Sequence, residues 1–230
     1  MYGKSKLKFT REKVQCVDYG FDFYAAQTME TEDGRSILIA WMQSGDNLMY
    51  PDTQRYSGMM TIPRELSIKE GRICQLPVRE IENYRSNVIR YDNVCIHEET
   101  ELKGISGRSI DLQIALKGNE YGKFIIKLAV DEKHYSEVIY DMDEKTLTFD
   151  RTYSGFKKDT ISTRSMYVSD KKDVINLRIL VDRFSVEIFV NDGEQVMTSL
   201  IYTPLDASGI SFASNGKAYL DVIKYDIEVE

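Results

Sequence analysis

The chain has 230 residues, 42% of them apolar, which is enough to build the core of one large all-β domain or two smaller domains. A formal net charge of −7 without a basic cluster argues against nucleic-acid binding, because phosphate binding needs grouped Lys and Arg. No long apolar run predicts a membrane span, and residues 1–13 lack the apolar region of a signal peptide. Cys16, Cys74 and Cys95 are odd in number and far apart, which favours reduced thiols in a cytoplasmic protein.

The first third of the chain contains predicted strands separated by long turns that are rich in aromatic residues. These strands are expected at residues 23–30, 35–43 and 58–66. Residues 76–87, "LPVREIENYRSN", have no period-2 pattern, so we expect a short helical or irregular connector there. This connector separates the first third from the remainder of the chain.

The remainder alternates apolar and polar residues at period 2, as half-buried strands do. Strands are expected within 108–118, 122–130, 134–141 and 145–151, followed by three strands within 176–202. The Asn215-Gly216 dipeptide predicts a closing hairpin within 210–229, because Asn-Gly favours a two-residue hairpin loop. Short strands at this spacing predict an antiparallel β-sandwich.

One stretch near the start, "VDYGFDFYAAQ" at residues 17–27, combines two aspartates with four aromatic residues. If it is a strand, one face carries Asp18, Gly20, Asp22 and Tyr24, and the opposite face is fully apolar over residues 19–23. Carboxylates accept hydrogen bonds from sugar hydroxyls and aromatic rings stack on C–H surfaces, so the acidic face suits a sugar. The alternative is a structural strand whose aspartates cap neighbouring turns.

Other kinds of site have little support in the sequence. His97 and His134 have no partner at metal-ligand spacing, and we predict neither a metal nor a cofactor. The sequence "DMDE" at 141–144 lacks the remaining ligands of a calcium loop and is better explained as a hairpin turn. No glycine-rich phosphate loop and no G-x-S-x-G nucleophile motif is present.

Several motifs together resemble the invertase and sucrose-6-phosphate hydrolase family, glycoside hydrolase family 32. They are "DYGFDFYAAQ", "ILIAWM", "GMMTIPRELSI" with "ICQLPVREI", "LTFDRTYSG" and "LRILVDRFSVEIFVNDGEQVMTS", and their order matches over essentially the whole chain. The resemblance implies a five-bladed β-propeller followed by a β-sandwich. It also implies cleavage of β-fructofuranosyl units with retention, by two carboxylates about 5 to 5.5 Å apart.

The catalytic motifs of this family, W-M-N-D-P-N-G, R-D-P and E-C, do not occur in the sequence. The chain therefore resembles the last two blades (1–77), a connector (78–90) and the C-terminal sandwich (91–230), with no catalytic residue of its own. The resemblance further implies that Asp18, Asp22 and Tyr24 line the rim of a sugar pocket and that Trp41 forms part of its apolar wall. Binding of a fructoside or sucrose-type sugar is expected to be weak.

Two further expectations concern partners. Blades cut from a ring leave an apolar face bare, so we expect the missing propeller half or a second copy to cover residues 1–75, in a homo-oligomer. The alternative function is a non-catalytic module for carbohydrate binding or oligomerisation. Its sandwich would need exposed aromatic residues, and the candidates, each more typical of strand packing, are Tyr121, Tyr135, Tyr140 and Tyr153.

Overall fold

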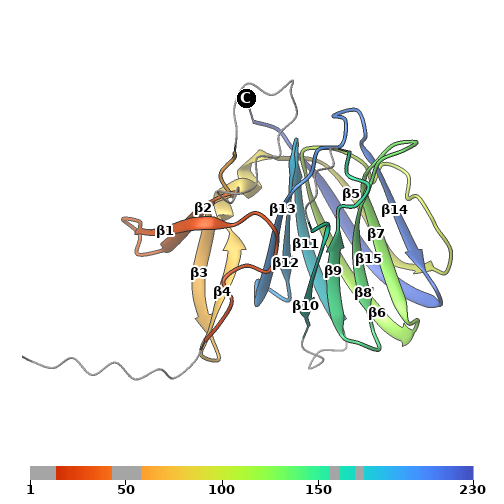
Figure 1. The fold of residues 1–230 in the computed structure, drawn as a ribbon, viewed down its shortest axis with the longest axis horizontal. Helices are drawn as coiled ribbons and strands as arrows, with labels where there is room; N and C mark the ends of the chain where they lie inside the picture. The colour runs from red at the N-terminus through yellow and green to blue at the C-terminus, as the bar shows by residue number, and fades with distance from the viewer. Residues whose placement is uncertain (1–13, 43–57, 156–160, 169–173, 230) are drawn as a thin grey trace, which may run out of the picture.

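The computed structural model describes residues 14–42, 58–155, 161–168 and 174–229. Fifteen strands form three antiparallel sheets in this part of the chain. The first four strands make one sheet, and the other eleven make two sheets packed face to face beside it (Figure 1). The fold is therefore all-β, as predicted. No helix in the described ranges has the length and apolarity needed to span a bilayer.

The N-terminal sheet, called here the blade sheet, joins four strands in sequence order. They are β1 (Tyr24–Glu30), β2 (Ser36–Trp41), β3 (Arg64–Lys69) and β4 (Arg72–Pro77). Such a meander of four neighbouring strands is the arrangement of a propeller blade. The described residues hold one such sheet; parts of the range assigned to two blades, 1–13 and 43–57, lie outside them.

The predicted connector contains a 3-10 helix, η1 (Arg79–Tyr84), and the next strand, β5 (Arg85–Ile96), begins directly after it. The sandwich thus starts at Arg85, whereas the prediction placed residues up to 90 in the connector. Strand β5 is an edge strand with a single buried residue, so it lacks the alternation that would have identified it.

The larger sandwich sheet has the strand order β13-β12-β11-β6-β15-β5. Its remaining strands are β6 (Ile110–Glu120), β11 (Val174–Asp182), β12 (Ser185–Val190), β13 (Gln195–Leu200) and β15 (Lys217–Ile227). The smaller sheet has the order β10-β9-β8-β7-β14. Its strands are β7 (Lys123–Val130), β8 (Ser136–Asp141), β9 (Thr146–Asp150), β10 (Thr163–Tyr167) and β14 (Gly209–Ser214).

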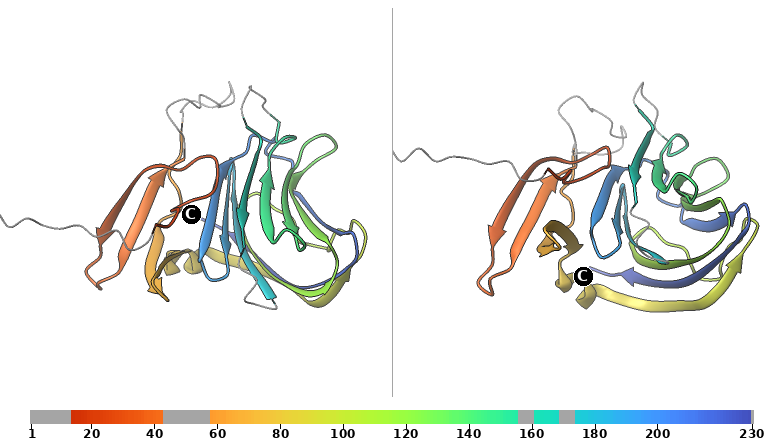
Figure 2. Two further views of the ribbon diagram at one scale, coloured as in Figure 1. Left: turned by 60° about the horizontal axis from the view of Figure 1, so that its bottom comes forward. Right: turned by 90° about the horizontal axis from the view of Figure 1, so that it is seen from below.

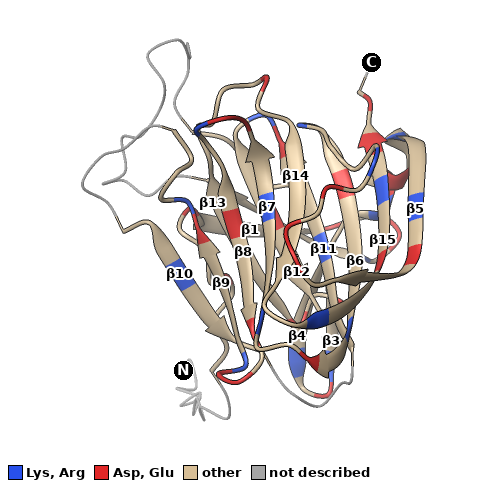
Figure 3. Ribbon diagram, turned by 90° about the vertical axis from the view of Figure 1, so that its right-hand side faces the viewer, with Lys and Arg blue, Asp and Glu red and all other residues tan. Residues whose placement is uncertain are grey.

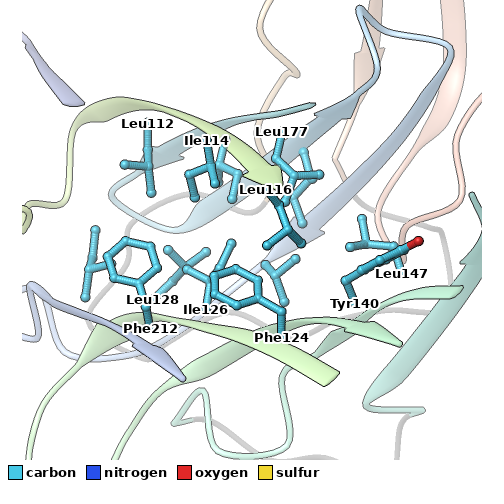
Figure 4. Packing of buried hydrophobic residues seen from close by; sticks show 14 of the residues in the cluster. Leu112, Ile114, Leu116, Phe124, Ile126, Leu128, Tyr140, Leu147, Leu177 and Phe212 are labelled. Atoms are coloured by element: carbon cyan, nitrogen blue, oxygen red, sulfur yellow. The ribbon is translucent and has the colours of Figure 1, made fainter. Parts of the chain in front are cut away.

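The core of the sandwich lies between these two sheets, as their period-2 sequences require (Figure 4). Leu112, Ile114 and Leu116 of β6 face Phe124 and Ile126 of β7 across the interior. Of the four tyrosines considered for sugar binding, Tyr121 and Tyr140 are buried in this core, whereas Tyr153 is exposed and stacks on Tyr135.

The prediction of a hairpin at Asn215-Gly216 was wrong. Strand β14 pairs with β7 in one sheet, and β15 pairs with β5 and β6 in the other, so the dipeptide carries the chain between sheets. Neither residue has the positive φ of a type I′ turn. Instead, Asn215 Oδ1 accepts hydrogen bonds from the amides of Gly122 and Lys123, and a Cβ on Gly216 would lie 2.1 Å from the Glu120 carbonyl oxygen.

Strand β12 departs from period 2 because all six of its residues are buried. One face packs into the core and the other faces the blade sheet, which lies beside β12 and β13 in all views (Figures 1 and 2). The molecule therefore has a second buried region, between the blade sheet and the sandwich, and several residues singled out in the sequence lie in it.

Candidate functional site

The aspartate-rich motif, residues 17–27, begins along the free edge of β13. The amides of Tyr19 and Phe21 donate hydrogen bonds to the carbonyls of Val196 and Thr198, at 2.9 Å each. Strand β13 is the last strand of its sheet, and an uncovered edge would expose unpaired backbone groups. Gly20 allows this close approach, because a Cβ there would lie 2.0 Å from the Thr198 carbonyl oxygen.

The two aspartates satisfy the β13 amides that point outward from this edge. Asp18 accepts hydrogen bonds from the Thr198 amide at 3.0 Å and from the Thr198 hydroxyl at 2.6 Å. It also accepts one from the Gly20 amide at 2.8 Å, which caps its own turn. Asp22 accepts from the Leu200 amide at 2.8 Å and from Arg151 Nη1 at 2.7 Å.

Neither carboxylate is accessible to a sugar. The Asp18 side chain is 1% exposed and the Asp22 side chain has no exposed surface. The open acidic face expected for residues 18–24 therefore does not form. The alternative, in which aspartates cap neighbouring backbone, describes both residues, because each carboxylate binds an edge amide that would otherwise be unpaired.

A buried arginine, Arg64 of β3, occupies the centre of the interface between the blade sheet and the sandwich. Its guanidinium donates to Glu187 Oε2 from Nη2 at 2.6 Å and from Nε at 3.2 Å, and to Asp18 Oδ2 from Nη1 at 3.1 Å. It also donates to the side-chain oxygens of Gln75 and Thr198. This cluster, called here the Arg64 network, satisfies a fully buried cation from both sides of the interface.

Two buried carboxylates share this one guanidinium, so the network is short of positive charge. Burial raises the pKa of Glu187, and the charge of Arg64 opposes that rise only in part. Burial likewise raises the pKa of Asp18, against the opposing effects of Arg64 and of the hydrogen bonds from Thr198 and Gly20. The interface therefore favours the protonated state of these carboxylates more than water does.

Small apolar clusters flank the Arg64 network. One joins Leu180, Phe189 and Val196 of the sandwich to Ile62, and the other joins Met42, Leu200 and Tyr202 to Met59 and Phe184. The aromatic side of the motif adds Phe21, whose ring lies 3.9 Å from the Arg151 guanidinium carbon and packs edge-on against Phe149. The interface is thus a polar centre with apolar margins.

The other two residues predicted to contact sugar lie elsewhere. Tyr24 and Trp41 are cross-strand partners on β1 and β2, with ring centroids 6.3 Å apart in an edge-to-face arrangement. Tyr24 is 56% exposed, and the strand bulges just after it, where Ala25 has a φ of 49°. The structure thus separates the four predicted residues into a buried pair of carboxylates and a pair of aromatic rings, of which Tyr24 is exposed and Trp41 is half-buried.

Sequence reasoning missed the partners of the aspartates: Arg64, Arg151, Glu187 and Thr198. Only Glu187 left a signal. It stands within "SVEIFV", where apolar residues occupy both strand faces, and a carboxylate in such a strand needs a cationic partner. The sequence offers no way to identify that partner as Arg64, which lies 123 residues away.

The comparisons with known proteins match both regions. Residues 1–77 match the model "Glycosyl hydrolases family 32 N-terminal domain", and residues 80–229 match "Glycosyl hydrolases family 32 C terminal". The chain belongs to glycosyl hydrolase family 32. The boundary between the two family 32 matches coincides with the start of η1.

Named relatives within family 32 are sugar hydrolases. A sucrose-6-phosphate hydrolase of Staphylococcus xylosus is 36% identical over 99% of this chain and 46% of its own length. A raffinose invertase of Escherichia coli is 35% identical over 89% of this chain and 42% of its own length. The chain therefore spans less than half the length of these relatives.

Solved family 32 structures support the same fold. The sucrose-6-phosphate hydrolase of Lactobacillus gasseri superposes with a TM-score of 0.80 at 27% identity, over 92% of this chain and 42% of that protein. The fructan 1-exohydrolase IIa of Cichorium intybus gives a TM-score of 0.80 over 92% of this chain and 49% of that protein, at 19% identity. At that identity the match supports a shared fold and nothing more. Propeller and sandwich architecture thus fits the described sheets.

Proposed function

We propose that this chain is the C-terminal part of a retaining β-fructofuranosidase that hydrolyses sucrose, sucrose 6-phosphate or fructan, and that the chain alone is inactive. The observation that carries the proposal is the match of two successive segments to the N-terminal and C-terminal models of one hydrolase family. The names of the relatives, a sucrose-6-phosphate hydrolase and an invertase, support this substrate class.

Inactivity of the chain alone follows from the chemistry that retention needs. One carboxylate must attack the sugar and a second must transfer protons, at about 5 to 5.5 Å. The three family motifs that supply such groups are absent from the sequence. The buried carboxylates Asp18, Asp22 and Glu187 are engaged by arginines and backbone amides, so they are unsuited to either role.

The test is an assay of the purified chain on sucrose and on sucrose 6-phosphate, with a full-length relative as the positive control. We expect glucose release no faster than in a buffer blank, since loss of a nucleophile costs many orders of magnitude in rate. A rate proportional to the amount of added chain would contradict the proposed inactivity. The nucleotide sequence directly upstream should encode the three missing motifs if the chain is part of an enzyme.

Sugar contact within the blade sheet is proposed for Tyr24 and Trp41, because their adjacent rings offer a partly exposed aromatic surface. Two rings are only part of a pocket, so the chain alone should bind a fructoside weakly. Calorimetric titration with fructose and sucrose, on the chain and on Trp41→Ala, measures this. Sub-millimolar affinity would contradict a partial site.

The alternative function is a non-catalytic module for carbohydrate binding or oligomerisation, and a specific observation favours association. The blade sheet exposes large apolar side chains, and so does Met60, which forms an isolated β-bridge with Trp41. The exposed fractions are 56% for Tyr24, 63% for Met29, 53% for Met60, 78% for Ile68 and 46% for Ile73. Exposed apolar groups gathered on one region are covered in most stable proteins. We propose that a second copy covers them when the chain is alone, and that the missing propeller half covers them in a complete enzyme.

Light scattering during size exclusion tests association directly. A homodimer or larger species at micromolar concentration is expected, and Ile68→Lys should shift it toward monomer. A monomeric chain whose blade amides are protected from hydrogen exchange would contradict this proposal. The proposed compartment is the cytoplasm, supported by the odd number of cysteines, all three of which are free thiols.

A further inference from the structure

A groove of about 470 Å³ lies where the outer face of the six-stranded sheet meets β4 and η1. Strands β5, β6, β11 and β15 form its floor, and Leu76, Glu82 and the Asp192-Gly193 turn stand at its margins. Its volume is within the range of about 300 to 1,000 Å³ that is typical of small-molecule sites. It is a feature of the sandwich surface, separate from the buried Arg64 network.

Strand register arranges the floor of this groove into two parallel rows of side chains. The first row crosses five neighbouring strands, with consecutive members paired: Phe189, Arg178, Gln113, Ile223 and Arg90. The second row contains Asn176, Ala115 and Asp221, each two residues along its strand from a member of the first row. Because side chains alternate along a strand, both rows project from the same face.

These rows present hydrogen-bonding groups that the protein itself does not use. The side-chain amides of Gln113 and Asn176 have no hydrogen-bond partner among the residues that the structure describes. Each amide offers both a donor and an acceptor. Arg178 is held in place by Asp111, with Nη2 and Nε at 2.8 and 3.1 Å from the carboxylate oxygens, so its position is set before any ligand arrives.

The charged groups of the lining do not favour an anion. Its ionised side chains are four carboxylates, on Glu82, Asp92, Asp192 and Asp221, and two guanidinium groups, on Arg90 and Arg178. Lys and Arg are likewise interspersed with Asp and Glu over the described strands, without one dominant basic region (Figure 3). Arg178 is paired with Asp111, and Arg90 lies 3.9 Å from Asp92, so both guanidinium groups of the lining already have carboxylate neighbours and neither is free to hold a phosphate.

The apolar part of the lining completes the pattern. Leu76 and Ile223, both half-buried, offer apolar surface for C–H groups between the amide and charged side chains. A ligand that matches this lining carries many hydroxyls, each both donor and acceptor, on an uncharged skeleton with C–H faces. We propose that the groove binds a neutral oligosaccharide, at a site independent of the sugar contact proposed for Tyr24 and Trp41.

Calorimetric titration of the whole chain with two neutral tetrasaccharides, nystose and maltotetraose, tests the proposal. Saturable binding of at least one is expected, and sucrose 6-phosphate should bind the groove more weakly. Ala115 lies in the middle of the floor, so Ala115→Tyr should fill the groove and weaken binding at least about tenfold. Asn176→Ala removes one amide and should weaken it about threefold to fivefold.

A matched control is Asn119→Ala, which removes an exposed amide from β6 outside the groove and should leave binding unchanged. All variants should melt close to the parent, and Asn176→Ala keeps the test decisive if the larger substitution disturbs the sheet. No saturable heat with either tetrasaccharide would overturn the proposal. So would binding that survives both groove substitutions, or that is lost only in Trp41→Ala, which would place the sugar on the blade sheet.

Discussion

The sandwich and the blade sheet are stabilised in different ways. In the described part of the chain, the main apolar core consists of 32 buried residues that all lie between Ile96 and Val222, inside the sandwich. The described part of the blade sheet and its loops contributes five buried apolar residues: Ile37, Leu38, Ala40, Met42 and Cys74. It adds a fully buried arginine, Arg64, whose acidic partners lie in the motif and in the sandwich. The blade sheet therefore depends on the sandwich for its order, whereas the sandwich carries its own core.

The apolar core and the buried polar network also have different physical roles. Apolar burial is non-directional and supplies most of the free energy of folding. The hydrogen bonds of Asp18, Asp22 and Arg64 are directional, and they bind alternate groups along β13. They fix which residue of the motif lies beside which residue of the sandwich, because a shift by one residue would leave buried charges without partners.

The largest expected effect comes from separating the two regions. Residues 85–230, made alone, should melt cooperatively because they keep the entire main core and a normal domain size. Residues 1–84, made alone, should show no cooperative transition, because Arg64 loses Glu187 and Met42 loses its apolar neighbours in the sandwich. Differential scanning calorimetry on each fragment measures this. Cooperative melting of both fragments would contradict the dependence of the blade sheet on the sandwich.

The next effect comes from Arg64→Met, which leaves Asp18 and Glu187 buried without their cation. The free energy of unfolding of the interface should fall by about 3–5 kcal/mol. Arg79→Met is the control, since its side chain is 67% exposed and pairs with Glu65 at the surface, where ion pairs contribute little. Denaturant titration compares the two. Equal losses in both variants would show that burial of Arg64 is unimportant.

A smaller effect concerns pH and Glu187→Gln. A raised pKa means that the native state holds its proton more tightly than the unfolded chain, so this stabilisation is present at low pH and is lost as pH rises from about 4.5. The melting temperature of the parent minus that of Glu187→Gln should therefore fall between pH 4.5 and 7. Thermal melts at several pH values give this difference, and a rise with pH would contradict the raised pKa.

The smallest effect, opposite in sign, is expected at Glu65. Its hydrogen bonds with Arg79 lower its pKa to about 2, so its contribution is present above about pH 4.5 and is lost as pH falls toward 2. The melting temperature of the parent minus that of Glu65→Gln should shrink over that range. Because the side chain is partly exposed, salt should reduce the difference further. An unchanged difference from pH 5 to 2 would contradict the effect.

Much of the sandwich could be predicted because its strands bury one face each and so alternate. Strands β6, β7, β8 and β9 follow this pattern and were identified near their observed bounds. The exposed edge strands β5 and β10 bury little, so they leave almost no pattern to detect. The Asn215-Gly216 turn misled because the dipeptide is a local preference, whereas the partners of β14 and β15 are chosen by the core.

The candidate site could be predicted only in part. The density of Asp18 and Asp22 among aromatic residues correctly marked the motif as unusual. Its purpose depends on Thr198 and Leu200, about 180 residues further along, and no local pattern reveals that β13 has an open edge there. The same residue types that bind sugar hydroxyls also bind backbone amides, so chemistry alone could not separate the two roles.

The position of β15 has a consequence for how this chain folds as it is made. Residues 217–227 lie between β5 and β6, and β5 has no other neighbour in its sheet. Until these residues have left the ribosome, β5 has no strand to pair with. The blade sheet, which is joined to β5 through η1, then has no completed sandwich sheet to pack against. The blade sheet should therefore remain accessible to chaperones and proteases until β15 has been made and paired, since a pairing this distant in sequence forms late.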